Sequence, residues 1–283
     1  MNVKPTIYFY LPVLDEQQTV GIFLYRLGEV MRNSRLDYEV FLTLDGCTDD
    51  SAAVVEPYLK RMPLRVTHNE KRLGYGKSLL ETINRVVSQS ANPKRDFFLV
   101  MDADFSLDPL ILNDMLDGIE RNVDFYHSDR LSEGKKSLSP SKRLAHRFAR
   151  SILRFRGVRT GQEPDYFSTL RGCRVHLLRC NLERLKPLGK LGPGVQPAAS
   201  ALVLLLALYR SARNPARIKI QERKLRRRKS RFALLALLRY LLFGKEIIST
   251  AAAPEAAPVI PRPPRRRYSN KKRRRSSKSE AGS

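Results

Sequence analysis

The stretch Phe97–Pro109, FFLVMDADFSLDP, decides the fold and contains the first candidate site. Its apolar start, Phe97–Met101, is long enough for one buried strand of a parallel sheet. Asp102 and Asp104 follow, and Asp108-Pro109 predicts a turn and the start of a helix. Because alternate side chains of a strand share a face, we expect both carboxylates to lean the same way at its carboxyl end. In open α/β sheets that edge binds ligands.

Two carboxylates this close repel each other unless a cation lies between them. Mg²⁺ or Mn²⁺, held by carboxylates together with substrate phosphates, suits such a pair. From these residues alone a second interpretation stays open, in which Asp104 caps the following helix and Asp102 is a solvated acid.

The positive charge of the chain is concentrated near its C-terminus. The 283 residues carry a net charge of +25, of which residues 210–245 contribute +12 and residues 251–283 contribute +8. Residues 250–283 are rich in Pro, Ala, Ser and like charges, so they cannot bury a core. We expect a catalytic domain over residues 1–228, a basic and apolar helix over 229–249, and a disordered basic tail over 250–283.

The cysteines and the apolar runs indicate the compartment. Cys47, Cys173 and Cys180 are odd in number and lack CxxC spacing, which argues against disulfides or a zinc site and for a reducing compartment. No signal peptide is visible, and no apolar run reaches the roughly 20 residues of a membrane span; the longest are Ala198–Tyr209 and Phe232–Phe243. We therefore expect a cytoplasmic protein, peripheral on a membrane if it touches one.

Strand-like and helix-like segments alternate through the first half of the chain. The segments that resemble strands are Thr6–Leu14, Tyr38–Leu44, Leu64–His68, Phe97–Met101 and Asp124–His127. Helical patterns between them end at Arg32 or cover Ser51–Lys60, Lys77–Ser88 and Leu110–Arg121. This alternation predicts βαβ units and a mostly parallel sheet.

A phosphate-binding P-loop is excluded by spacing. Gly76-Lys77-Ser78 resembles the end of that motif, but the first glycine would have to stand at position 71, which is Lys71. Gly74 and Gly76 still permit close approach of the backbone to a ligand, and Lys77 offers it a positive charge.

Five segments in order carry a family resemblance: LPVLDEQQTV from Leu11, TLDGCTDDS from Thr43, HNEKRLGYGKSLLETI from His68, VMDADFSLDP from Val100 and SDR from Ser128. The series resembles family 2 glycosyltransferases of the GT-A fold, and is most similar to their polyprenyl (dolichyl) phosphate sugar synthase branch. The resemblance implies a Rossmann-like, mostly parallel sheet flanked by helices. It also implies a metal-dependent, inverting transfer of a sugar from a nucleotide-diphosphate donor.

The resemblance also implies roles for single residues. Asp102 and Asp104 would hold the metal against the diphosphate, whose developing charge the cation stabilises. Arg130 would clamp a phosphate; the alternative is a surface arginine. Glu16 would accept hydrogen bonds from base or ribose, or else be an acid favoured by the helix dipole. The donor-binding positions implied by the match are Pro12, Leu14, Glu16, Asp45, Gly74, Lys77, Ala103, Arg130 and Arg231.

Asp45 matches the second acid of a turn that contacts the base in the family. Gly46, which follows it, would let the turn adopt a positive φ. Asp45 would alternatively organise that turn without contacting a ligand.

Beyond residue 130 the match is looser. Lys142–Phe155 is an amphipathic basic helix placed as the acceptor-loop helix of the family would be. Gln162–Leu178 loosely resembles the family's Asp-Pro-x-Ser-Gly-Phe-Arg stretch, with Asp165 or Glu163 where its acid would stand. Asp165 could then serve as a general base. A polyprenyl phosphate is already anionic and needs none, and the chain lacks the Thr-Glu-Asp motif of processive members.

The C-terminal quarter supplies the expected partners besides the donor. Ser230-Arg231 fits a Ser-Lys pair of the branch, although Leu225 and Arg228 depart from its pattern. The basic cluster Arg223–Arg231 followed by apolar Phe232–Phe243 fits an anionic membrane surface, or alternatively a terminal helix packed on the domain. A nucleic-acid partner is not expected, because the tail holds few aromatic residues to stack bases. The alternative to the enzyme is a degenerate binding protein whose tail contacts nucleic acid or acidic lipid.

Overall fold

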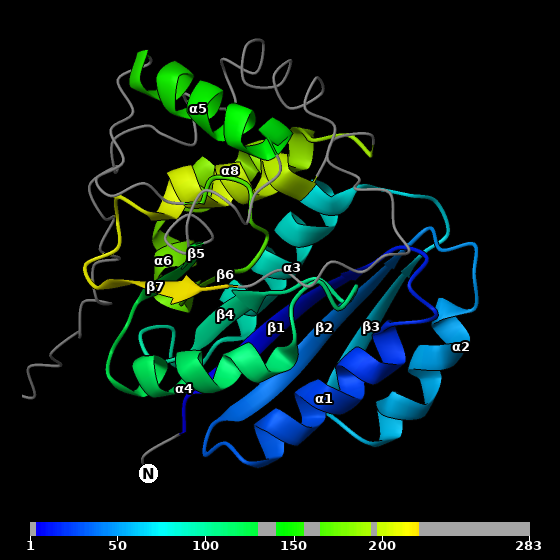
Figure 1. Cartoon of the computed structure of the whole chain (residues 1–283). Coiled ribbons are helices and arrows are strands. Elements are labelled where there is room, and N and C mark those ends of the chain that lie inside the picture. Colours follow the sequence, from blue (N-terminus) through cyan, green and yellow to red (C-terminus); the bar gives the residue numbers. More distant parts are fainter. Residues whose placement is uncertain (1–3, 130–139, 156–164, 194–196, 221–283) are drawn as a thin grey trace, which may run out of the picture.

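The computed structural model describes residues 4–129, 140–155, 165–193 and 197–220. Its centre is a seven-stranded sheet of order β3-β2-β1-β4-β6-β5-β7 (Figure 1). The strands are β1 (Thr6–Val13), β2 (Asp37–Asp45), β3 (Leu64–Asn69), β4 (Phe97–Val100), β5 (Phe125–Asp129), β6 (Arg171–Arg174) and β7 (Pro215–Lys219).

The sheet is parallel except around one strand. β1 pairs in parallel with β2 and β4, β2 with β3, and β5 with β7, whereas β6 is antiparallel to both β4 and β5. The prediction of a mostly parallel sheet of the GT-A type is confirmed. The carboxyl ends of β1, β2 and β4 therefore meet at one edge of the sheet.

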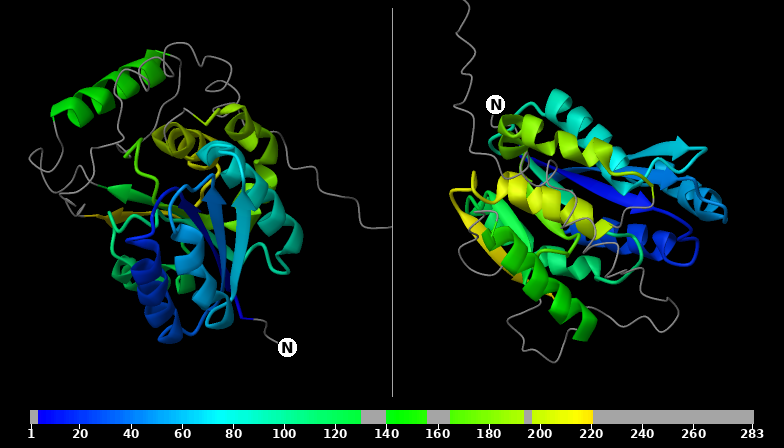
Figure 2. Two further views of the ribbon diagram at one scale, coloured as in Figure 1. Left: turned by 90° about the vertical axis from the view of Figure 1, so that its right-hand side faces the viewer. Right: turned by 90° about the horizontal axis from the view of Figure 1, so that it is seen from above.

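Helices cover both faces of this sheet (Figure 2). One face packs against α1 (Val20–Arg32), α2 (Ser51–Val55) and α4 (Leu112–Glu120). The other face packs against α3 (Tyr75–Gln89), α5 (Pro140–Phe155), α6 (Val175–Cys180) and α8 (Pro197–Leu208). Shorter helical turns are α7 (Leu182–Leu185) and the 3₁₀ segments η1 (Glu56–Lys60), η2 (Pro109–Ile111) and η3 (Lys186–Lys190).

Two predicted helices are divided in the structure. The helix predicted over Ser51–Lys60 is α only to Val55, and Pro57 then falls in the first turn of η1, where its missing N–H costs nothing. The helix predicted from Leu110 likewise begins with η2, in which Pro109 follows its capping residue Asp108.

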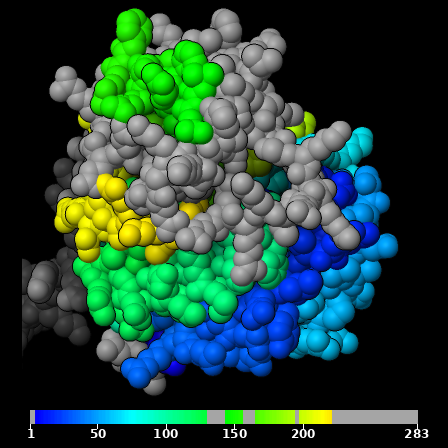
Figure 3. Space-filling view, viewed as in Figure 1, coloured from blue at the N-terminus to red at the C-terminus, as the bar shows by residue number. Residues whose placement is uncertain are grey.

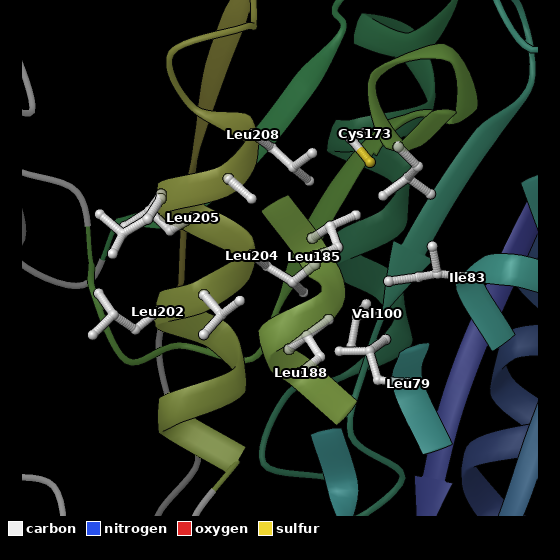
Figure 4. Packing of buried hydrophobic residues seen from close by; sticks show 14 of the residues in the cluster. Leu79, Ile83, Val100, Cys173, Leu185, Leu188, Leu202, Leu204, Leu205 and Leu208 are labelled. Carbon is white, nitrogen blue, oxygen red and sulfur yellow. The ribbon is translucent and has the colours of Figure 1, made fainter. Parts of the chain in front are cut away.

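The apolar run predicted at Ala198–Tyr209 forms α8, which is buried on all sides from Ala198 to Leu208. Leu204, Leu205 and Leu208 of this helix pack in one cluster with Leu79 and Ile83 of α3 (Figure 4). A helix that is apolar around its whole circumference belongs in a protein core or a membrane, and this one lies in the core. Among the described residues, no helix is long and apolar enough to span a bilayer.

Candidate functional site

The candidate site lies at the edge where β2, β1 and β4 end. Pro12 and Leu14 are half-buried at the end of β1, and Asp45 is the last residue of β2. Asp102 follows two residues after β4 ends. The strand order brings these positions, which are up to 90 residues apart in the chain, to one edge of the sheet.

The acid pair lies in a turn rather than on a strand. β4 ends at Val100, so strand alternation does not by itself orient Asp104. Asp102 accepts a hydrogen bond of 2.5 Å from Thr169 Oγ1, and Asp104 accepts one of 2.9 Å from the N–H of Ser106. Burial raises the pKa of the Tyr75 phenol well above its ordinary value, and the negative charges of Asp102 and, less strongly, Asp104 act in the same direction.

Helix capping does not account for Asp104. The residue that caps the following helical turn is Asp108, whose Oδ1 accepts a 3.0 Å hydrogen bond from the N–H of Leu110. Between the acids, Ala103 is 1% exposed and its methyl group joins the apolar cluster on the opposite face of the sheet. The turn is therefore anchored in the core between two half-buried carboxylates.

Asp45 holds together the loop between β3 and α3. Its Oδ1 accepts hydrogen bonds from Asn69 Nδ2 (3.0 Å) and from the N–H of Leu73 (2.8 Å), and its Oδ2 accepts one from the N–H of Gly74 (2.9 Å). The adjoining Gly46 has a φ of 69°, as the turn was predicted to need. Asp45 thus has the organising role that the sequence left open, and contact with a base stays a prediction.

The glycines at the start of α3, Gly74 before it and Gly76 in its first turn, pack closely against another segment of the chain. A methyl group on Gly74, whose φ is 98°, would lie 2.8 Å from Pro193 Cα, and one on Gly76 would lie 2.6 Å from the carbonyl oxygen of Leu188. Close packing against the 188–193 segment therefore accounts for both glycines. Lys77, in the first turn of α3, is exposed.

A second group of acids connects the loops after β1 and β2. Ligand atoms of Asp15, Cys47 and Asp49 lie within 4.8 Å of one another. Asp15 accepts from the N–H of Thr48 (2.8 Å), and Asp49 accepts from the N–H groups of Gln17 and Ser51 (both 3.0 Å). Burial raises the pKa of the Cys47 thiol, which keeps it protonated and a poor ligand for hard cations. These contacts identify a loop clasp.

Glu16 belongs to the same clasp. It is 6% exposed and precedes α1; its N–H donates to Ser51 Oγ (2.8 Å) and its Oε2 accepts from Thr19 Oγ1 (2.9 Å). The contact of Glu16 with a base or ribose stays a prediction.

Asp165 is a fully buried carboxylate near the acid pair. It is 0% exposed, and its Oδ1 accepts from the N–H groups of Phe167 (3.0 Å) and Ser168 (3.1 Å). His146 Nε2 of α5 lies 3.3 Å from the same oxygen, and its ring packs 4.7 Å from the Phe167 ring. Asp165 therefore joins α5 to the segment that carries Thr169.

Arg171, at the start of β6, is buried beside this segment. It is 2% exposed and donates to Ser128 Oγ at 3.0 Å and to the backbone carbonyl of Asp165. Its position across the sheet is fixed, because Val100 pairs with Tyr10 on one side and with Arg171 on the other. Paired residues share a face, so Tyr10, Val100 and Arg171 form one row beneath Asp102.

The row continues to His127 of β5, which pairs with Arg171. His127 is 3% exposed and packs against Phe125 and Tyr209. Burial, followed by the nearby Arg171, lowers the pKa of His127 from 6.5 to about 4, so the ring is neutral at pH 7.

Three residues that contact candidate site residues were not singled out from the sequence: Thr169, Arg171 and His146. Thr169 and Arg171 lie within a quoted stretch, and a Ser-Thr-Leu-Arg run matching the Ser-Gly-Phe-Arg of the family was the available signal. Three expected residues, Arg130, Glu163 and Arg231, lie outside the described residues.

A mostly parallel sheet with a carboxylate pair at its carboxyl edge defines a GT-A-type glycosyltransferase domain. Residues 9–182 match Glycosyl transferase family 2, and the chain belongs to that family. The family resemblance read from the five segments is thereby confirmed, whereas the polyprenyl phosphate branch is not established by this match. No curated protein is significantly similar to the chain.

Solved structures with the same fold include glucosyl-3-phosphoglycerate synthase from Mycobacterium tuberculosis. Its complex with UDP has a TM-score of 0.58 at 17% identity, covering 89% of this chain and 82% of that one. Its complex with Mn²⁺, UDP and glucosyl-3-phosphoglycerate has a TM-score of 0.57 at 16% identity, with the same coverage. At this identity the likeness shows the fold.

Proposed function

We propose that the chain catalyses the metal-dependent, inverting transfer of a sugar from a nucleotide-diphosphate donor. The observation that carries the proposal is the position of Asp102 and Asp104 directly after β4, at the carboxyl edge of a family 2 sheet. Ligands of open α/β sheets bind at this edge. The printed ligands of the solved neighbours, Mn²⁺ with UDP, support the same class of donor and cation.

The residues present fit a hard divalent cation. Asp102 and Asp104 offer carboxylate oxygens, the donors that Mg²⁺ and Mn²⁺ prefer, and Thr169 fixes one oxygen of Asp102. A cation held there would supply positive charge against the departing diphosphate. The loop tied to Asp45 leads directly into α3, whose N-terminus with Lys77 adds positive potential at the same edge.

For the acceptor we propose a phosphate-bearing molecule, and specifically a polyprenyl phosphate at a membrane surface. Asp165 is buried and already accepts from two backbone N–H groups, so it is poorly placed to deprotonate a hydroxyl. An ionised phosphate needs no such base. The phosphoglyceric acid named with the solved neighbours is likewise a phosphate-bearing compound.

Surface chemistry of α5 supports the membrane part of this proposal. Leu144, Phe148 and Phe155 are 44%, 44% and 93% exposed, and they alternate with exposed Arg143 and Arg147. The helix contains no acid. Exposed apolar and basic side chains on one helix suit an anionic lipid surface. Three further parts of the proposal rest on the sequence alone. They are the basic cluster Arg223–Arg231, the domain boundaries at 228 and 249, and the phosphate contacts of Arg130 and Arg231.

Donor turnover with Asp104→Ala tests the function. The purified full-length chain is incubated with Mn²⁺ and a panel of UDP- and GDP-sugars, with and without polyprenyl phosphate, and released nucleoside diphosphate is measured. We expect the variant to lose turnover by about 100-fold or more, as when a main charge-stabilising group is removed. Asp108→Ala, which removes an acid from the same turn together with the cap of η2, is the matched control and should retain activity. Equal turnover by Asp104→Ala and the native chain would remove the proposed metal site.

The second candidate function is a catalytically degenerate domain whose basic tail binds nucleic acid or acidic lipid. Its support is the charge of +8 over residues 251–283. Deleting residues 250–283 separates the two functions. If the tail alone is functional, the deletion abolishes binding to nucleic acid or anionic vesicles, and neither the full chain nor the shortened chain releases nucleoside diphosphate.

A further inference from the structure

Three buried hydroxyl groups belong to β1 and to the start of α3. The side-chain oxygens of Tyr10, Tyr75 and Ser78 are buried, and none has a hydrogen-bond partner among the described residues. The Tyr10 and Tyr75 rings meet edge to face with centroids 6.1 Å apart, and Ser78 lies one turn along α3 from Tyr75. A buried hydroxyl without a partner is destabilising, so its retention calls for an explanation.

The backbone places this group next to the acids. The N–H of Met101 donates to the carbonyl of Tyr10 at 3.1 Å, which fixes the residue before Asp102 against Tyr10. Gly74, the residue before Tyr75, is held by Asp45. Consistent with this geometry, the charges of Asp102 and Asp104 both act on the Tyr75 hydroxyl, with Arg171 acting in the opposite direction.

Neither Asp102 nor Asp104 supplies the hydrogen-bond acceptor that the Tyr75 hydroxyl lacks. Asp102 and Asp104 are already present, and they accept from Thr169 and from the Ser106 N–H. An acceptor that arrives with the ligand, close to a metal held by those acids, is an oxygen of the diphosphate. We propose that Tyr75 is a donor-binding residue, whose hydroxyl hydrogen-bonds a diphosphate oxygen of the metal–nucleotide complex. This inference rests on the proposed function.

Calorimetric titration of Tyr75→Phe with nucleotides tests it. The full chain is titrated with UDP and with GDP in the presence of MnCl₂, and then with the matching monophosphate. The better diphosphate should bind about tenfold more weakly to the variant, as expected for one lost hydrogen bond to a charged group. Affinity for the monophosphate should change less than about twofold, because the second phosphate is absent.

Tyr126→Phe is the matched control. Tyr126 is also a buried tyrosine, but its hydroxyl donates to the Met115 carbonyl at 3.1 Å, away from the acid pair. Its removal should lower the melting temperature and leave nucleotide affinity unchanged. Tyr75→Phe should show the opposite pattern, with no loss of melting temperature in the absence of ligand. If Tyr75→Phe fails to fold, Tyr75→Leu serves as the second variant, with the same tenfold loss expected.

The outcomes separate the two proposals. Failure of the native chain to bind either diphosphate with Mn²⁺ would overturn the proposed function. Binding that Tyr75→Phe and Tyr75→Leu leave unchanged would overturn only the role of Tyr75, and would assign the three hydroxyls to buried water. Equal losses for diphosphate and monophosphate would likewise exclude the diphosphate contact.

Discussion

The two halves of the sheet differ in the charged side chains that hold their loops. Around β2 and β1, the carboxylates of Asp45, Asp15 and Asp49 accept hydrogen bonds from backbone N–H groups of neighbouring loops. Around β6, Asp165 and Asp124 also accept from backbone N–H groups, but buried arginines in addition donate to backbone carbonyls. Arg174 reaches the carbonyls of Val123, Arg95 and Ile119, and Arg184 reaches that of Leu206.

The difference follows from which backbone groups in each half lack a hydrogen-bond partner within their own helix or strand. Ile119 and Leu206 lie in the last turns of α4 and α8, where carbonyls have no partner within the helix and a cation is favoured. The loops at the carboxyl edge present N–H groups, which need acids. The comparison shows that buried charged side chains can serve to hold loops and helix ends together. A buried charge is therefore not by itself evidence of a ligand site.

The largest effect on stability is expected at Arg174. It is 7% exposed, and Arg174→Met would remove the guanidinium donor from the carbonyls of Val123, Arg95 and Ile119, of which Ile119 still accepts from the N–H of Asn122. We expect a loss of about 3 kcal/mol in the free energy of unfolding, measured by urea denaturation. Arg210→Met, at an exposed position, should change it by less than about 0.5 kcal/mol. Similar free energies of unfolding for the two variants would show that the half of the sheet around β6 does not depend on the contacts of Arg174.

Asp45→Asn should have an intermediate effect. The amide keeps one acceptor oxygen but cannot accept at both positions that bind the N–H groups of Leu73 and Gly74. We expect a loss of about 2 kcal/mol in the free energy of unfolding. Asp50→Asn, exposed in the adjoining loop, is the control. A variant of native stability that no longer binds nucleotide would instead assign Asp45 to the base alone.

The smallest effect is the pH response of His127. Its folded pKa of about 4 lies below the ordinary 6.5, so the unfolded chain binds the proton more readily. The contribution of neutral His127 to the free energy of unfolding is therefore fully present above pH 6.5, and it is lost as the pH falls toward 4. Between pH 7 and pH 5 we expect a loss of about 1–2 kcal/mol, which His127→Gln should abolish. An equal pH dependence in native chain and variant, measured by urea unfolding, would contradict the assignment.

The sequence predicted the parts whose signals are local. The strand at Thr6–Leu14 and the helix ending at Arg32 follow apolar periodicity, and the structure has them as β1 and α1 with boundaries within one residue. β6 was not predicted as a strand, because it is four residues long and contains two buried arginines. No periodic pattern signals such a segment, and arginine is ordinarily exposed.

For the site, the sequence found the acids but not what holds them. Asp102 and Asp104 stand out beside a buried strand. Thr169, which donates to Asp102, is 67 residues away in sequence, and the pairing depends on β6 lying next to β4. The clasp between Asp15 and Thr48 depends in the same way on β1 pairing with β2.

The antiparallel insertion of β6 has a consequence for the connection that precedes it. β5 ends with Asp129 at the carboxyl edge, and β6, its antiparallel neighbour, starts from that same edge with Arg171. The chain between them leaves and re-enters the sheet at adjacent positions, so its length is not constrained by strand pairing. Of this connection, the described helix α5 is tied back to the core through Ala145, Ala149 and Leu153 and through the contact of His146 with Asp165, so packing on the sheet, and not strand pairing, fixes where it lies.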